Sequence, residues 1–179
     1  MTCIRIVAPV GSVVDLAGLR DQCRVDGTDH DASLTAFGLA AEAYLDGYGG
    51  ILGRAILPQT WRDTFTGWGE LRLTLPDVAS VVVSYQDAAG VWITITAPTI
   101  ERDDRGWFLT ATGPDTAAVR VDYVAGLASD KLPVAAVIVR LMVANWFANR
   151  EAVVTGTIVA DLPMAVDALI GVLVWRRVG

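Results

Sequence analysis

Residues 118–149 read AVRVDYVAGLASDKLPVAAVIVRLMVANWFAN, and two different patterns meet in this stretch. Its first part, 118–124, is short and rich in Val, which is typical of a strand. Its second part begins at Pro133, a residue favoured in the first turn of a helix, and stays apolar on nearly every side as far as Asn149. A helix of this kind is normally buried over most of its surface. The stretch therefore predicts that a β-rich region ends near residue 124 and that a buried helix follows it.

Upstream of this stretch, residues 58–123 contain a series of short runs rich in Val, Ile, Thr and aromatic residues. The predicted strands are Trp61–Phe65, Glu70–Leu75, Val78–Gln86, Val91–Thr96, Ile100–Asp103, Trp107–Thr110 and Ala118–Val124. Turn sequences such as Thr66-Gly67 and Pro76-Asp77 separate these runs. Short strands at this spacing favour an antiparallel meander or a small barrel over parallel units.

The first third of the chain has the features of two helices. Ser12 with Asp15 forms a helix-start signal ahead of a helix predicted over Val13–Arg24. After a turn, apolar residues recur at helical spacing from Leu34 to Tyr48, and a cluster of glycines ends this second helix. We therefore predict an antiparallel pair of helices here.

The last apolar segment, Pro163–Trp175, is compatible with a helix or a strand, because its final run is too short for periodicity to decide. Together these patterns predict an α+β fold, mainly a helical bundle with an inserted antiparallel β subdomain. Residues 1–57 and 124–179 would form the helical core, and residues 58–123 the β-rich insertion.

The 179-residue chain is unusually apolar. With Gly counted and Tyr left out, about 60% of its residues are apolar, against about 45–50% in typical soluble domains. The longest stretch without a charge, Ala88–Ile100, contains Gly90 and Pro98 and is shorter than the roughly 18 residues of a membrane span. The N-terminus also lacks the pattern of a signal peptide. We expect no membrane association, and we expect the excess apolar surface to serve contacts between subunits.

The charge and cysteine content exclude further classes. A net charge of −6 with a single Lys argues against a protein that grips nucleic acid phosphates. Cys3 and Cys23 have no CxxC spacing, and we interpret both as reduced apolar residues rather than a disulfide.

Catalytic patterns are equally sparse. His30 is the single histidine, and it stands at a helix start, where a solvated side chain is the simplest interpretation. The glycines between Gly47 and Gly53 miss the GxGxxG spacing and follow a helix instead of a strand. Asp103-Asp104 precedes Arg105-Gly106 in what we interpret as a turn. We therefore predict no catalytic residues, no metal site and no cofactor, and a protein that is not an enzyme.

Three groups of residues, taken in order, resemble a known family. They are Leu19-Arg20 through Asp26-Gly27-Thr28-Asp29; Pro58-Gln59-Thr60-Trp61 after a Tyr-rich, Gly-terminated helix; and Val121–Gly126 followed by Leu132-Pro133 and the helix end Trp146–Glu151. Over roughly residues 10–175 this order resembles the tailed-phage head–tail connector (adaptor) family, which has relatives in prophages and gene transfer agents. No single motif is diagnostic, but the ordered set is fairly specific.

The resemblance implies a structural protein of a phage or phage-like particle. It would be assembled in the bacterial cytoplasm and located in the head–tail neck of the virion. About twelve subunits would form a closed ring beneath the portal protein. The ring would extend the DNA channel, let DNA pass without sequence-specific binding, and offer a platform to a stopper or tail-terminator protein.

The resemblance also assigns residues. Docking on the portal would fall to the C-terminal segment, with the residues Leu169, Ile170, Leu173, Trp175, Arg176 and Arg177. For Asn149, Arg150 and Glu151 two readings stay open, a contact between subunits or simple helix termination. Two other functions also remain, another neck protein (a stopper or tail-completion protein, expected to be mainly β) and a small-molecule-binding α+β protein.

Overall fold

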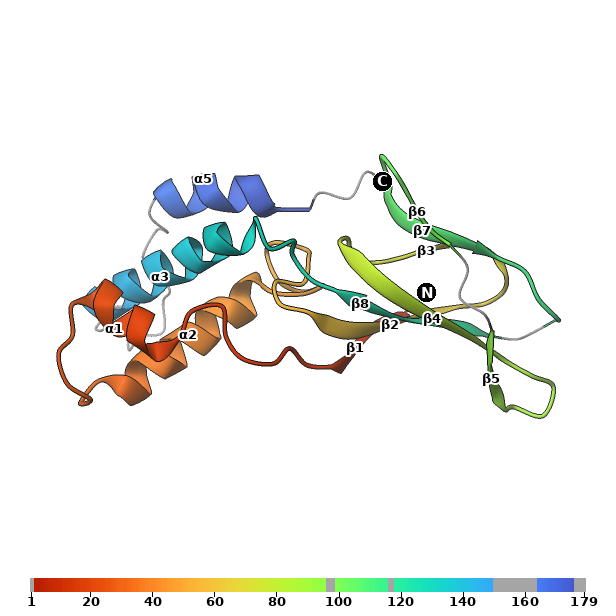
Figure 1. Cartoon of the computed structure of the whole chain (residues 1–179), viewed down its shortest axis with the longest axis horizontal. Coiled ribbons are helices and arrows are strands. Elements are labelled where there is room, and N and C mark those ends of the chain that lie inside the picture. The colour runs from red at the N-terminus through yellow and green to blue at the C-terminus, as the bar shows by residue number, and fades with distance from the viewer. Residues whose placement is uncertain (1, 96–98, 116–117, 150–163, 176–179) are drawn as a thin grey trace.

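The structure, a computed structural model, describes residues 2–95, 99–115, 118–149 and 164–175. Its helices gather at one end of an elongated molecule and its strands at the other (Figure 1). The helices are α1 (Leu16–Cys23), α2 (Asp31–Leu45), α3 (Leu132–Ala148) and α5 (Met164–Leu173). The α+β class predicted from the sequence is confirmed.

Helix α3 is the centre of the helical end. It packs against α1 and α2 on one side and against α5 on the other (Figure 1). Its side chains Ile138, Val139 and Met142 are fully buried, as the nearly all-round apolar sequence predicts. The shared core of the four helices also contains Leu34 from α2 and Leu173 from α5.

The two N-terminal helices are those predicted, with ends set by polar contacts. The Asp15 carboxylate accepts a hydrogen bond of 2.8 Å from the Gly18 amide and so caps α1. Arg20 of α1 donates from Nε to Asp31 of α2 over 2.7 Å, and this ion pair ties the two helices together. After α2, Gly47 adopts a φ of +79°, a conformation that L side chains rarely take.

Eight described strands form two antiparallel sheets. The five-stranded sheet has the order β1-β2-β8-β4-β5 and the three-stranded sheet the order β3-β7-β6. The bounds are β1 Thr2–Val7, β2 Gln59–Phe65, β3 Gly69–Arg72, β4 Val78–Gln86, β5 Trp92–Ile95, β6 Ile100–Asp103, β7 Gly106–Ala111 and β8 Val119–Ala125. The strands predicted between residues 59 and 125 are all present, with ends that differ by a few residues.

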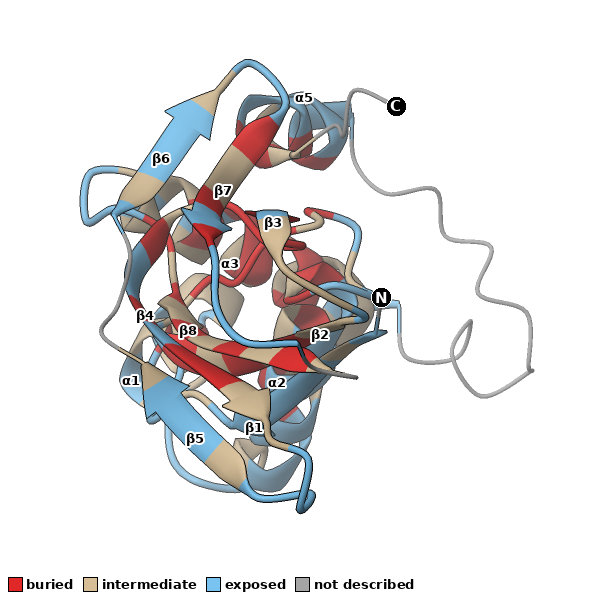
Figure 2. Ribbon diagram, turned by 90° about the vertical axis from the view of Figure 1, so that its right-hand side faces the viewer, coloured by how far each residue is buried: buried red, intermediate tan, exposed pale blue. Residues whose placement is uncertain are grey.

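The pairing of these strands differs from the predicted meander. Strand β8 lies between β2 and β4, so the last strand of the insertion occupies the middle of the larger sheet. Its alternate residues Val119, Val121 and Tyr123 are buried and share a core cluster with Leu109 of β7. Figure 2 shows buried segments on both β8 and β7. Burial of this alternating face favours the central position over a hairpin with the preceding strand.

Strand β1 is a second difference, because residues 2–7 were expected to belong to the helical core. They instead form the edge of the larger sheet, with Ile4 opposite Arg62 of β2. Ile4, Ile6 and Val7 are all exposed, so these three side chains do not belong to the hydrophobic core. Pairing with a strand more than fifty residues away positions this segment.

Candidate interaction surfaces

Helix α5 has one side that belongs to the core of the chain itself. Ile170 is 8% exposed and Leu173 is fully buried, and both pack in the core around α3. Leu169 is partly buried against the same core. These predicted docking residues therefore hold α5 to its own chain, and in this arrangement Ile170 and Leu173 offer no surface to a partner.

The opposite side of α5 is exposed and almost entirely apolar. Met164 is 89% exposed and Val172 is 69% exposed, and Ala165, Ala168 and Gly171 are exposed between them. Asp167 is the one charged residue of the helix, and it is also exposed. We call the four residues Met164, Ala165, Ala168 and Val172 the outer face of α5.

Trp175 joins the end of α5 to both halves of the molecule. Its backbone amide donates a hydrogen bond of 2.8 Å to the carbonyl of Leu52 in the loop after α2. The Arg54 guanidinium lies 6.0 Å from the centre of its indole ring, and a Cβ on Gly106, the first residue of β7, would come within 3.3 Å of that ring. Trp175 is therefore a structural anchor at the junction of helices and sheets.

Arg54, beneath this indole, is itself a buried charge. Its side chain is 7% exposed and donates to the Asp77 carboxylate over 2.9 Å. Burial lowers the pKa of its guanidinium, and Asp77 acts in the opposite direction. The Arg54–Asp77 pair thus fixes the loop that holds Trp175.

Asn149 ends α3. Both its backbone amide and its side-chain Nδ2 donate to the Asn145 carbonyl, over 3.0 Å and 2.9 Å. These bonds match the reading of this site as helix termination. The other predicted site residues, Arg150, Glu151, Arg176 and Arg177, lie outside the described residues.

Two adjoining cavities form a groove along α2, on the side of the helical end away from α5. The first cavity measures about 240 Å³ and lies between Pro9, Val13, Asp46 and Leu57. The second measures about 230 Å³ and reaches Asp15 and Thr35. Leu39 and Glu42 line both cavities, so the two lie side by side along α2, and we call them together the α2 groove.

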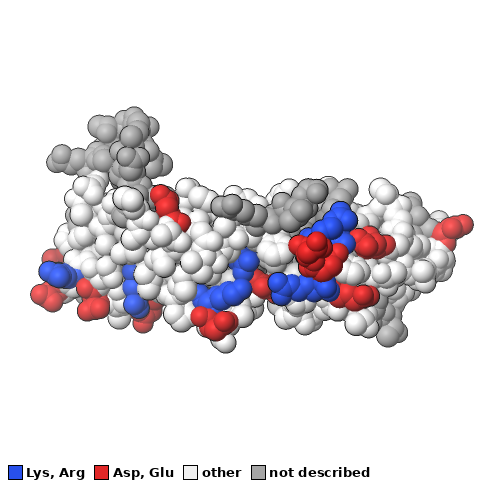
Figure 3. Space-filling view, turned by 90° about the horizontal axis from the view of Figure 1, so that it is seen from above, with Lys and Arg blue, Asp and Glu red and all other residues white. Residues whose placement is uncertain are grey.

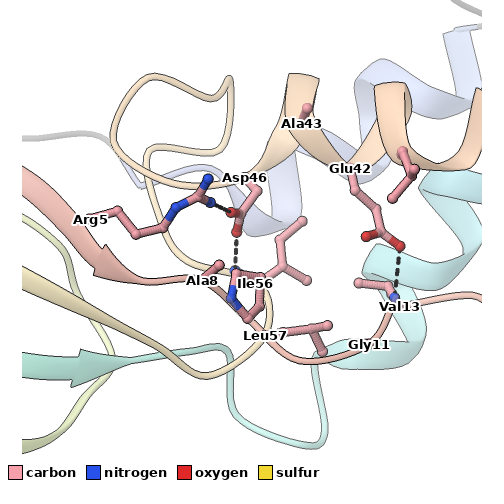
Figure 4. A pocket seen from close by; sticks show the side chains of 11 residues that line it. Arg5, Ala8, Gly11, Val13, Glu42, Ala43, Asp46, Ile56 and Leu57 are labelled. Carbon is pink, nitrogen blue, oxygen red and sulfur yellow. Dashed lines mark hydrogen bonds and ion pairs between the residues drawn. The ribbon is translucent and has the colours of Figure 1, made fainter. Parts of the chain in front are cut away.

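Two carboxylates of α2, one helical turn apart, point into this groove (Figure 4). Asp46 accepts hydrogen bonds from the Ile56 amide and from Gln59, and it pairs with Arg5 over 3.4 Å. Glu42 accepts from the Val13 amide over 2.7 Å and has no ion-pair partner among the described residues. Burial raises the pKa of Glu42, and the nearby Asp46 charge adds to this effect.

A further acid is buried between the two sheets. Asp63 is inaccessible to solvent, and one of its oxygens accepts from the Thr74 amide over 2.7 Å and from the Tyr123 hydroxyl over 3.3 Å. Its other oxygen has no hydrogen-bond partner among the residues that the structure describes. Burial raises the pKa of Asp63 and, to about 12, that of the neighbouring Cys3 thiol. Because the thiol is therefore protonated at neutral pH, this cluster is unsuited to nucleophilic chemistry.

Five of the eleven basic side chains in the described part of the chain are engaged in ion pairs. Arg5, Arg20, Arg54, Arg62 and Arg72 each lie within 4 Å of a carboxylate. On the face that carries α5 and β6, most of the visible basic groups lie beside acidic ones (Figure 3). This mixture differs from the gathered positive charge that binds phosphates. No helix in the described segments is long and apolar enough to cross a membrane.

The sequence interpretation missed both the outer face of α5 and the α2 groove. In the helical pattern of α2 alone, Glu42 and Asp46 lie on the side opposite the apolar residues and give no sign of a site. The segment before α1 packs beside that face and turns it into a groove. The pattern of α2 contains no signal for this, because the covering segment has no helical or strand periodicity of its own.

Comparison with known proteins relates the chain to a solved structure. No protein-family model matches the sequence, and none of the curated proteins matches it. Among solved structures, the chain is similar to a chain in one described as the neck of an empty GTA (gene transfer agent) particle computed with C6 symmetry. The two are 26% identical, and the match covers 100% of this chain and 98% of that chain with a TM-score of 0.74. This full-length likeness supports a protein of the neck, or head–tail, type.

Proposed function

We propose that the chain is a head–tail connector (adaptor) of a phage or phage-like particle, such as a gene transfer agent. About twelve copies assemble as a closed ring beneath the portal protein. The ring extends the DNA channel and joins the capsid to a stopper or tail-terminator protein. Its role is structural and not enzymatic.

The observation that carries this proposal is the full-length likeness to a chain from the neck of a GTA particle. That structure has sixfold symmetry, and a ring of twelve is compatible with it because twelve is a multiple of six. The ordered motifs of the sequence support the adaptor role specifically. A stopper, the main alternative, is expected to be mainly β, whereas this chain combines its two sheets with a bundle built around α3.

For the portal contact we propose the outer face of α5 in place of the buried side of this helix. Large exposed apolar patches mark contact sites, and this face presents Met164, Ala165, Ala168 and Val172 with little charge. Small residues let another backbone or helix approach closely. Ile170 and Leu173 support this contact indirectly, because they hold α5 in position.

The test mixes the purified chain with the portal protein of the same particle and measures co-sedimentation and negative-stain images. We expect a ring of density on one face of the portal. Val172→Asp places a charge on the outer face of α5 and should weaken the complex at least tenfold. Val91→Asp is the matched control, because Val91 is 57% exposed in the turn before β5. Equal binding of both variants would contradict the α5 contact, and no ring with the unaltered chain would contradict the adaptor role.

A further inference from the structure

We infer that the α2 groove binds an extended protein segment that carries an apolar side chain and a Lys or Arg. The proposed portal contact does not use this groove, which lies on the other side of α3 from α5 (Figure 1). The inference rests on the shape, the lining and the charge of the groove.

The length of the groove favours an extended segment of protein. The groove follows α2 from Thr35 to Asp46, a length of about 16 Å at 1.5 Å per residue. About five residues of extended chain span that distance.

The lining of the groove defines one half of the ligand. Leu39, between the two cavities, is 57% exposed although its neighbours Val14 and Ile56 are buried. An apolar side chain placed against Leu39 would remove this surface from water, which is favourable. The groove therefore suits an apolar anchor at its centre.

The charges define the other half. Glu42 and Asp46 project toward the groove from successive turns of α2, and Asp15 lies at the far end of the second cavity. Arg5 is the single basic residue that lines either cavity, and it is already paired with Asp46. Glu42 is left half-buried, with the Val13 and Val14 amides as donors and no cation among the described residues. A guanidinium or ammonium group beside Glu42 would balance this charge.

The direct test uses hexylguanidinium, which combines an apolar chain with an arginine-like head, as the probe. It is titrated into the full-length, isotope-labelled chain, and backbone amide shifts are followed by NMR. We expect saturable shifts of the amides of Val13, Leu39, Glu42 and Ala43. Hexanoate, with the opposite charge, should give none there. Equal shifts with both probes, or shifts spread over the whole surface, would overturn the inference.

Variants separate the two halves of the ligand. Glu42→Gln keeps an oxygen that can accept from the Val13 amide, so the fold is preserved while the charge is lost; hexylguanidinium should then bind about fivefold more weakly. Glu101→Gln, on exposed strand β6, is the control and should leave binding unchanged. Leu39→Ala should also weaken binding, whereas Val91→Ala should not. If Glu42→Gln bound the probe with unchanged affinity, the inferred role of charge in this groove would be refuted. If Leu39→Ala bound it with unchanged affinity, the inferred apolar contact would be refuted.

Discussion

Replacing Leu173 by Ala tests whether α5 belongs to the core of the chain. Leu173 is fully buried among the helices, and Val172, its neighbour in sequence, is 69% exposed. Leu-to-Ala changes in a core cost about 2–5 kcal/mol, because they lose buried apolar area and leave a cavity. Exposed positions away from special features usually change stability by less than about 0.5 kcal/mol.

For a chain of this size, 1 kcal/mol corresponds to a shift in Tm of roughly 2–4 °C. Leu173→Ala should therefore lower the Tm by about 5–15 °C, and Val172→Ala by less than about 2 °C. Thermal unfolding of the full chain, followed by circular dichroism, measures both. If Leu173→Ala had the Tm of the unaltered chain, α5 would not be packed on α3, and the division of its two sides into core and docking surface would be wrong.

Three further changes test other parts of the structure. In the folded chain, burial raises the pKa of Asp63 above its value of about 3.9 in the unfolded chain. Folding therefore becomes less favourable as the pH rises above about 4, because the buried side chain must then lose its proton. Asp63→Asn should therefore gain stability relative to the unaltered chain between pH 4.5 and 8 in urea unfolding, and a constant difference would refute this. Trp175→Ala keeps the backbone bond to Leu52 but removes the indole that packs on Arg54, so it should speed hydrogen exchange across α5. Unchanged exchange would show that the indole does not hold α5 in place. Gly47→Ala forces a Cβ to within 2.9 Å of Trp61 at a φ of +79° and should cost at least about 1–2 kcal/mol; a neutral effect on the free energy of unfolding would contradict the left-handed turn.

Local pattern was sufficient for most of the elements. The helices before residue 48, the apolar helix α3 and the strands between 59 and 125 have capping residues, periodicity or turn residues that act over a few positions. The partner of each strand is a matter of long-range contacts. The sequence of β8 therefore indicates a strand but not its place between β2 and β4. Residues 2–7 have the composition of a strand, yet their pairing with β2 depends on residues far away in the sequence.

The candidate docking residues show the same limit more sharply. The family resemblance assigned the apolar side chains of the C-terminal segment as anchors for a partner. Ile170 and Leu173 instead pack in the core of the chain itself. The exposed side chains of α5 are therefore the ones available for a contact with another protein. A sequence pattern marks both sides of α5 as apolar, and only the packing on α3 distinguishes them.

The central claim is that the chain forms a ring between the portal and the tail. Electron cryomicroscopy of particles that contain this chain tests it most directly, with the structure fitted as one body into the neck density. We expect a ring of copies immediately below the portal, with the outer face of α5 against it. Neck density into which neither the helical end nor the sheets can be fitted, or a ring formed at the distal end of the tail, would contradict the account.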